Sequence, residues 1–479
     1  MIVMKQKILL LLIVTGILGA VSCTKDWEEL NTDPNNPISV PPTNILAQAI
    51  RYSGDRLYNA WFSMNNTGSY AGHVSKIQYM DEARYFEREG VINNNWYHIY
   101  TTLQDLKNAK KLALEEDNQY LYAACLTFES FLFQIATDTW RDIPFTQACR
   151  AADADQILNP AYDTQEMIYP ALIDSLKKAN EIFNLNRIDV LGDGDLLFGG
   201  DVSKWQKFAN SLRLRMAVRA SGVSNTGTIA AEIIADPATY PIMASNEDNA
   251  FLIWPGAAPY KEPWFEDSET RDDHAVCKTL VDHMLTKADP RLPIYAHPAQ
   301  SDGQYRGVVA GESDANLGDI KQYSRIGARF RDNAAGFTPF MRYAEVLFLV
   351  AEVDPSAATY EAGIRASMEE NGIEAADIDA YIAANAFSDV DDIYYEKWVA
   401  LFKQSHEAWA ETRRTGVPAL GAPPPEDCRF PNHNVPPFRH SYPTNELKLN
   451  SENVAPYNEK LVDKFWGQQM WWDTRTNVY

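Results

Sequence analysis

The stretch Gly200-Asp-Val-Ser-Lys-Trp-Gln-Lys-Phe-Ala-Asn-Ser-Leu-Arg-Leu-Arg215 decides the fold class of this chain. In and just beyond it, large apolar side chains recur at steps of three and four, as on one face of a helix. These side chains are Trp205, Phe208, Leu212 and Met216. Ser203 is a favoured residue for a helix start, and Gly222 for a helix end. The stretch therefore predicts a long amphipathic helix that packs against other helices.

The same period recurs along most of the chain. Strong helical stripes lie at 121–135, 341–351 and 394–416, and weaker ones at 43–60, 93–115, 165–184, 275–287 and 356–371. Only 251–254 and 320–323 have the pattern of short strands. Long irregular segments separate the helices, at 236–274 and at 416–443, where eight prolines occur. We expect a mainly α protein, with paired helices as a scaffold and a large second layer built from loops.

Composition narrows the class of function. With 43 basic and 65 acidic residues the chain has a formal net charge of −22, so it should repel nucleic acid. The quoted helix is nevertheless basic, through Lys204, Lys207, Arg213, Arg215 and Arg219. We expect these side chains to form ion pairs with neighbouring helices.

The N-terminus has the pattern of an export signal. Lys5 and Lys7 precede an apolar run of 13 residues at 8–20, which is shorter than the roughly 20 residues of a membrane-spanning helix. Small residues follow and then Cys23, which resembles a bacterial lipobox, where the cysteine receives the lipid; an ordinary secretory signal is the alternative. The predicted divisions are a lipoprotein signal peptide at 1–22, a lipid anchor and tether at 23–42, and one folded domain at 43–479.

Aromatic side chains in the predicted loops are the candidate ligand contacts. A sugar ring presents an apolar C–H face that stacks on Trp or Tyr, while its hydroxyls need polar partners nearby. Two clusters of rings have this character, Trp61, Tyr70, Tyr79 and Trp96 in the first, and Trp254, Tyr260, Trp264 and Phe265 in the second. The alternative is that these rings pack long loops onto the scaffold.

Signs of catalysis or metal binding are weak. The chain has no nucleophile elbow, phosphate-binding glycine loop, zinc-binding helix motif or dinucleotide fingerprint, so we predict no catalytic residues and no cofactor. Four aspartates, Asp189, Asp193, Asp195 and Asp201, surround a glycine-rich turn that suits calcium only weakly, because the spacing differs from a helix–loop–helix calcium site. Four cysteines besides Cys23 contain no Cys-x-x-Cys pair, and their disulfide state is left open.

Several segments resemble the SusD/RagB family of outer-membrane nutrient-binding lipoproteins. They occur in order from residue 23 to about 450, and their combination is specific although each alone is weak. The segments are Cys23-Thr-Lys-Asp, Leu30-Asn-Thr-Asp-Pro-Asn-Asn-Pro37, Asp142-Ile-Pro-Phe145, the 200–215 stretch, Asp289-Pro-Arg-Leu-Pro293, Met341-Arg-Tyr-Ala-Glu-Val-Leu-Phe-Leu-Val-Ala-Glu352, Glu411-Thr-Arg-Arg-Thr-Gly416 and Phe438-Arg-His-Ser-Tyr-Pro443. The chain departs from the pattern at Trp140-Arg141, where the family has glycine, and at Arg439-His440, where it has paired arginines.

The resemblance implies a SusD-like fold, in which tetratricopeptide-like helix pairs support a loop-rich half that faces the ligand. It also implies a lipid-anchored protein of the outer membrane, facing the cell exterior, that binds glycans and delivers them to a SusC-like TonB-dependent transporter. A peptide-binding lipoprotein of the RagB type is an alternative within the family. Two further alternatives are not ligand-binding lipoproteins of this kind. One is a helical-barrel glycoside hydrolase, and the other is an interaction scaffold without a ligand of its own.

Overall fold

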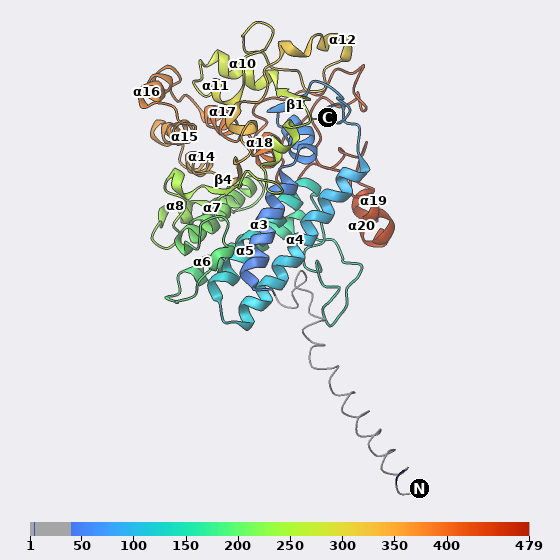
Figure 1. Ribbon diagram of the computed structural model, residues 1–479, viewed down its shortest axis with the longest axis vertical. Coiled ribbons are helices and arrows are strands. Elements are labelled where there is room, and N and C mark those ends of the chain that lie inside the picture. Colours follow the sequence, from blue (N-terminus) through green and yellow to red (C-terminus); the bar gives the residue numbers. More distant parts are fainter. Residues whose placement is uncertain (1–3, 5–39, 479) are drawn as a thin grey trace.

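The computed structural model describes residues 40–478, together with Met4. Its larger part is a body of antiparallel helices, which Figure 1 shows in the lower half of the molecule and along one side. These helices are α3 (Pro42–Leu57), α4 (Glu89–Glu115), α5 (Gln119–Trp140), α6 (Gln165–Phe183), α7 (Val202–Ala220), α8 (Gly227–Ala235), α14 (Tyr343–Val353), α15 (Ala357–Glu370), α16 (Ala375–Ala384), α17 (Val390–Ala400) and α18 (Ser405–Thr415). The predicted mainly α architecture is confirmed.

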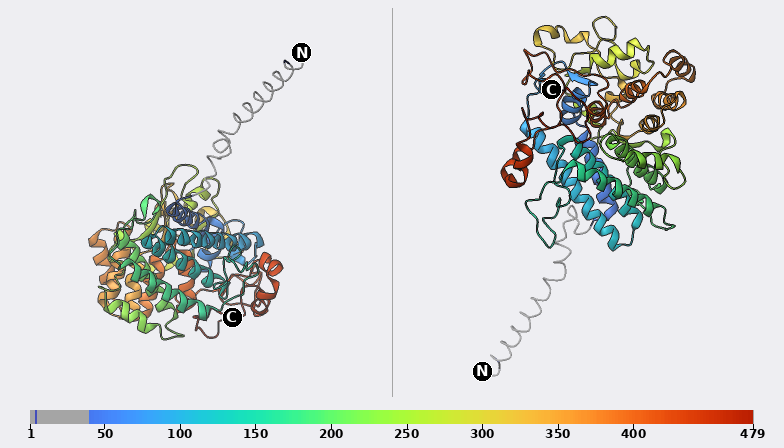
Figure 2. Two further views of the ribbon diagram at one scale, coloured as in Figure 1. Left: turned by 90° about the horizontal axis from the view of Figure 1, so that it is seen from below. Right: turned by 180° about the vertical axis from the view of Figure 1, so that it is seen from behind.

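Short elements and loops form the second layer, above the helical body in Figure 1 and visible from two further sides in Figure 2. Its helices are α9 (Pro263–Ser268), α10 (Lys278–Thr286), α11 (Leu292–Tyr295), α12 (Asp314–Leu317) and α13 (Ala328–Arg331), while α19 (Thr444–Leu449) and α20 (Ser451–Asn458) lie at the edge of the body. Two antiparallel strand pairs join distant segments: β1 (Val74–Lys76) with β3 (His274–Val276), and β2 (Ala250–Ile253) with β4 (Phe337–Met341). In the first pair Lys76 lies opposite His274.

The quoted stretch forms α7 as expected, but its start differs from the prediction. Asp201 caps the helix, because its carboxylate accepts a hydrogen bond from the backbone N–H of Lys204 at 3.1 Å, and Ser203 lies within the first turn. The apolar stripe is buried, with Trp205, Phe208 and Leu212 fully shielded from solvent. An aspartate is as good a cap as a serine, so the sequence alone left two possible starting points, two residues apart.

Two predictions of secondary structure are wrong. The stripe at 394–416 is divided between α17 and α18, because the chain turns at Lys403, whose φ is +72°. The Lys403 ammonium turns inward, donates to the carbonyl of Phe330 at 2.9 Å and pairs with Glu262 at 2.9 Å. The predicted strand at 320–323 is a 3₁₀ turn, Ile320–Gln322, because the Asp319 carboxylate accepts from the N–H of Lys321 and closes the turn. Gly416 ends α18 as expected, in the left-handed conformation with φ +75°.

The predictions for the N-terminal segment fall mostly outside the described part of the chain. The signal peptide at 1–22, Cys23 and the tether up to residue 39 are not described, and α3 begins immediately after, at Pro42. Within residues 40–478, no helix has the length and apolar character that crossing a membrane requires.

Candidate ligand-binding cleft

The densest group of charged side chains lies inside the helical body, around α7. Arg219 donates to Asp138 on α5 at 2.6 Å and to Glu411 on α18 at 2.9 Å, and it also pairs with Glu407. Arg215 donates to Glu345 on α14 at 2.5 Å. All of these side chains are buried. The expectation of ion pairs with neighbouring helices is confirmed for Arg215 and Arg219, and Arg213 lies 3.9 Å from Glu232 on α8. Lys207 pairs with Asp248 in a short turn at 3.0 Å, whereas Lys204 donates to the backbone carbonyl of Glu247 and has no ion pair among the described residues.

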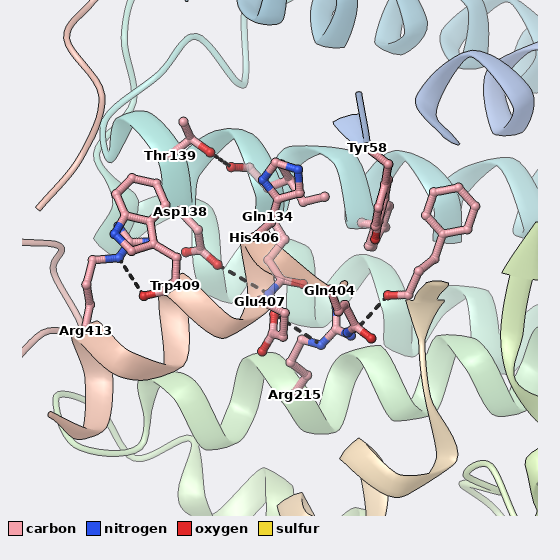
Figure 3. Close-up of a pocket in the computed structure, with 13 residues that line it drawn as sticks. Tyr58, Gln134, Asp138, Thr139, Arg215, Gln404, His406, Glu407, Trp409 and Arg413 are labelled. Atoms are coloured by element: carbon pink, nitrogen blue, oxygen red, sulfur yellow. Dashed lines mark hydrogen bonds and ion pairs between the residues drawn. The ribbon is translucent and has the colours of Figure 1, made fainter. Parts of the chain in front are cut away.

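An interior cavity of about 20 Å³ lies beside this group, and Figure 3 shows Asp138, Arg215, His406 and Glu407 around it. This volume holds about one water molecule and excludes any sugar or peptide. The carboxylates of Asp138 and Glu407 are both bonded to Arg219, so neither is free to act as an acid or a nucleophile. The group therefore joins four helices, α5, α7, α14 and α18, and is no substrate site.

A cleft of about 490 Å³ opens in the second layer, next to the strands β1 and β3. One wall is a π-helix, η1 (Ala60–Gly68), which begins after Asn59, whose side chain accepts from the N–H of Phe62 at 3.0 Å. Phe62 is completely buried, whereas Trp61 is 42% exposed at the cleft. π-helices are rare and recur at functional sites, where the wider turn redirects side chains.

Tyr79 also lines the cleft, and this residue is 64% exposed. Its φ is +53°, a left-handed conformation that bulky residues seldom adopt. A strained backbone that presents an exposed aromatic ring is an unusual combination, and strain of this kind concentrates at ligand-binding sites. Trp61 and Tyr79 are therefore the two rings that a ligand in this cleft can reach.

Cations lie against both rings. The guanidinium carbon of Arg88 is 5.3 Å from the centre of the Trp61 ring, and Lys76 Nζ is 5.6 Å from it. Arg271 lies 6.0 Å from the centre of the Tyr79 ring. Contacts of this kind hold a ring in one orientation, so the platform is ordered before a ligand arrives.

The basic and acidic side chains that line the cleft are equal in number. The cleft is lined by three basic side chains, Lys76, Arg88 and Arg271, and three acidic ones, Asp81, Asp267 and Asp273. Arg271 pairs with Asp273 at 3.4 Å, and Arg88 lies 3.8 Å from Asp81. Lys76 pairs with Glu82 at 3.6 Å, and Asp267 pairs with Arg331 at 3.0 Å. Each charge thus has a partner of opposite sign, and the cleft offers hydrogen-bonding groups without a net charge.

His274 forms part of the floor. Burial lowers the pKa of His274 well below its usual range, so the ring is neutral at pH 7. Its Nε2 lies 2.7 Å from Asn65 Oδ1 and donates to it, because an amide oxygen can only accept. Its Nδ1 lies 3.6 Å from Asp267, and burial raises the pKa of that carboxyl.

The predicted ligand rings lie in different surroundings. Trp61 and Tyr79 share the cleft, whereas Trp96 lies in a second cavity along α4. Tyr260 is 44% exposed on another part of the surface, with Arg51 over its ring at 5.2 Å, and Phe265 is half-buried. The two predicted clusters therefore do not form two continuous platforms.

The prediction needs correction for Tyr70, Trp254 and Trp264, whose rings are buried in the core with exposures of 3%, 3% and 0%. Trp254 Nε1 donates to the hydroxyl of Thr338 at 2.9 Å, which ties β2 to β4. Trp264 packs edge-on against Phe402, their ring centres 6.2 Å apart. A loop that covers a scaffold needs large apolar anchors, and these three rings have that role.

Residues that sequence reasoning missed supply most of the polar surface of the cleft. Lys76, Arg88, Arg271 and His274 come from two distant segments, 76–88 and 271–274, and the pairing of β1 with β3 brings these segments together. No local pattern predicts that pairing, because both strands have only three residues. The left-handed backbone at Tyr79 also leaves no sequence signal.

The acidic turn considered for calcium has a structural role. Asp195 accepts from the backbone N–H of Leu197 and Gly200 and from Trp205 Nε1 at 2.8 Å, and Asp189 accepts from the N–H of Gln119. Among the described residues, no group of three or more His, Cys, Asp or Glu side chains is arranged to hold a metal ion. Cys125, Cys149, Cys277 and Cys428 are free thiols.

Comparison with known proteins identifies the family. Residues 34–443 match the model of the SusD-like family, which is described as "Starch-binding associating with outer membrane". The chain belongs to the SusD-like family. No curated protein matched the chain.

Solved structures share the fold of this SusD-like protein. A chitin-binding protein is 23% identical with a TM-score of 0.78, and the match covers 91% of this chain and 100% of that chain. A SusD homologue of Bacteroides uniformis is 23% identical with a TM-score of 0.77, covering 91% and 99%. A chitin-binding SusD homologue of Flavobacterium johnsoniae is 21% identical with a TM-score of 0.78, covering 91% and 98%. At these identities the likeness establishes the fold alone.

Proposed function

We propose that this chain is a non-enzymatic lipoprotein of the outer cell surface that binds glycan in the Trp61/Tyr79 cleft. It then delivers the glycan to a SusC-like TonB-dependent transporter. The observation that carries the proposal is the cleft itself, in which two exposed rings lie above a floor of hydrogen-bonding side chains. Sugars need this combination, because one face of a pyranose is apolar and its edge carries hydroxyls. The family description, with starch, and two relatives named for chitin support the same class of ligand.

The balance of charge favours an uncharged glycan. An acidic sugar would need a free cation, but Arg88 and Arg271 already lie against carboxylates in the cleft. Hydroxyl groups can bridge such pairs without breaking them, since each hydroxyl both donates and accepts. Neutral polymers of glucose or N-acetylglucosamine are therefore the first candidates.

A peptide ligand is the second candidate within the family, and the cleft favours it less. Peptides are bound by exposed strand edges or by deep apolar pockets. Strand β1, which lies beside the cleft, is buried along its whole length. The floor of the cleft is polar, because His274 donates to Asn65 and Asp267 accepts from Arg331 at 3.0 Å.

Calorimetry with oligosaccharides of glucose and of N-acetylglucosamine tests the site. Trp61→Ala and Tyr79→Ala should each weaken binding at the cleft by about 1–3 kcal/mol, the value of one stacking ring, and leave the melting temperature near wild type. The matched control is Tyr260→Ala, which removes a ring of similar exposure outside the cleft and should leave binding unchanged. If all three variants bind as tightly as wild type, the cleft is the wrong site.

The anchor and the transporter need separate experiments. Cys23→Ser should release the protein from outer membranes and abolish lipid labelling, because the thiol is the proposed acceptor of the lipid. Purification of the wild type from native membranes in mild detergent should recover a large β-barrel partner. Recovery of this chain alone at native expression would contradict delivery to a transporter while leaving glycan binding intact.

A further inference from the structure

A second cavity of about 490 Å³ follows the exposed face of α4. Its floor consists of the α4 residues Asn93, Tyr97, Thr101 and Asp105, which recur every four positions. At about 1.5 Å per residue, this stripe is about 18 Å long. Leu158, from the loop after α5, and Leu449, at the end of α19, lie along its rim. The cavity is therefore an elongated groove with the dimensions of a chain-like ligand.

The apolar part of the groove is unusually open. Tyr97 is 62% exposed, and Leu158 and Leu449 are each 75% exposed. Trp96 and Tyr100, whose ring centres are 4.7 Å apart, also line the groove. Large apolar side chains gathered in a hollow, rather than scattered, mark a surface that another molecule covers.

Two polar groups in the groove have no partner. Asp105 forms no hydrogen bond or ion pair within the described residues, and burial raises the pKa of its carboxyl. Asn445 uses its backbone N–H to bond Asn93 at 3.2 Å, and its side-chain amide is unbonded in the described structure. A lipid chain or an apolar helix would cover these groups without satisfying them, which costs free energy. A ligand with hydroxyl groups would satisfy both.

We propose that this groove, which lies along α4 from Asn93 to Asp105, is a second glycan-binding site. The ligand stacks on Tyr97, and its hydroxyls donate to Asp105 and bond the amide of Asn445. This inference rests on the proposed function, since it takes the ligand to be the glycan that the Trp61/Tyr79 cleft binds.

The position of the groove suits the capture of a polymer. Arg88, which precedes the first residue of α4, lines the Trp61/Tyr79 cleft, and Asn93, in the second turn of the same helix, begins the groove. One rigid helix therefore sets the spacing of the two sites. Two linked contacts on one polymer raise its apparent affinity without any new interaction, because the second contact forms at a high local concentration.

Calorimetry on the lipidated wild type in detergent, with a short oligosaccharide of N-acetylglucosamine or of glucose, tests this inference. Wild type should bind two oligosaccharides per chain. Tyr97→Ala should weaken one of these events by about 5- to 150-fold and leave the melting temperature unchanged, since alanine suits an exposed helix position. Asp105→Asn, which keeps the shape of the side chain, should weaken the same event, and Tyr260→Ala is the control that should change neither.

The outcomes separate this inference from the proposed function. If Tyr97→Ala binds like wild type while Trp61→Ala loses all binding, the groove is no glycan site and the cleft stands. If Trp61→Ala has no effect and Tyr97→Ala loses all binding, the groove stands and the cleft assignment fails. If wild type binds no oligosaccharide of either polymer, both fail. If Tyr97→Ala keeps both binding events but loses the co-purifying β-barrel partner, the groove docks a protein and the inference is overturned.

Discussion

The charged group around Arg219 and the cleft of Trp61 and Tyr79 contain similar side chains but have opposite roles. Around Arg219 the carboxylates and guanidinium groups are buried between helices, beside a cavity of about 20 Å³. In the cleft the ion pairs surround about 490 Å³ of open space and two exposed rings. A dense cluster of charges is therefore no sign of a binding site by itself. Open volume and exposed rings distinguish the site, whereas burial marks the structural group.

Removal of Arg219 should produce the largest effect of all. Arg219→Ala leaves Asp138, Glu407 and Glu411 buried without the cation that they share, and breaking such a group costs about 3–5 kcal/mol of the free energy of unfolding. Denaturant unfolding measures the change. Oligosaccharide binding by the protein that remains folded should stay at the wild-type value, because no residue of the group lines the Trp61/Tyr79 cleft or the groove along α4.

Arg365→Ala provides the matched control. Arg365 pairs with Asp379 at 2.6 Å on the surface, where its side chain is 41% exposed, so its loss should cost about 0–1 kcal/mol. Equal stabilities for the two variants would show that the interior group contributes no more than a surface ion pair.

Acid should weaken the helical body through its buried histidines. Burial lowers the pKa of His406 to about 4, from an unfolded value of about 6.5, and His406 Nε2 donates to the carbonyl of Leu57 at 2.7 Å. Because the folded ring resists protonation, its contribution to stability is complete above pH 6.5 and is lost as the pH falls towards 4. The loss from this one residue is at most about 3 kcal/mol.

His406→Gln should reduce the slope of the melting temperature between pH 6.5 and 4, since a glutamine amide can also donate to Leu57 and does not titrate. His297→Gln is the control, because the His297 side chain is 43% exposed. If both variants keep the wild-type slope of melting temperature against pH, the acid sensitivity comes from other groups. His73 and His440, whose pKa values burial lowers to about 3, would then be the next to replace.

Sequence predicted the helical body better than the loops, for physical reasons. The stripes of α5, α7 and α15 have a local period, so a single segment suffices to predict each helix. Of the rings predicted to contact ligand, Trp61 and Tyr79 are exposed, whereas Tyr70, Trp96, Trp254 and Trp264 are buried. A sequence pattern does not separate the two groups, because anchoring rings and ligand rings have the same composition. Only tertiary structure distinguishes them.

The polar floor of the cleft lay beyond sequence reasoning altogether. Asn65 contacts His274, which lies more than 200 residues further along the chain, and the two strands that hold them together are too short to predict.

The groove along α4 could be predicted in part from the sequence. Its stripe from Asn93 to Asp105 lies on one predicted helix, but its rim comes from residues near 158 and 449.

The smallest expected effect comes from a comparison of two tyrosines, Tyr79 and Tyr85, which share a left-handed backbone conformation. Tyr79 and Tyr85 both have left-handed φ values, +53° and +68°, which cost a non-glycine residue about 1–2 kcal/mol. Tyr79 is 64% exposed, whereas Tyr85 is 3% exposed and packs its ring 5.2 Å from that of Trp466. Tyr79→Gly relieves the strain, and the greater freedom of glycine in the unfolded chain offsets about 0.5–1 kcal/mol of that gain. We expect Tyr79→Gly to give a net stabilisation of about 0.5–1 kcal/mol together with weaker glycan binding, measured by thermal unfolding and calorimetry.

Tyr85→Gly is the control and should instead lower the melting temperature. The free energy gained by relieving the backbone strain is smaller than the free energy lost when a buried ring is removed. If Tyr79→Gly destabilises the protein as Tyr85→Gly does, the Tyr79 ring supports the fold, and its strained backbone gives no reason to place a ligand there.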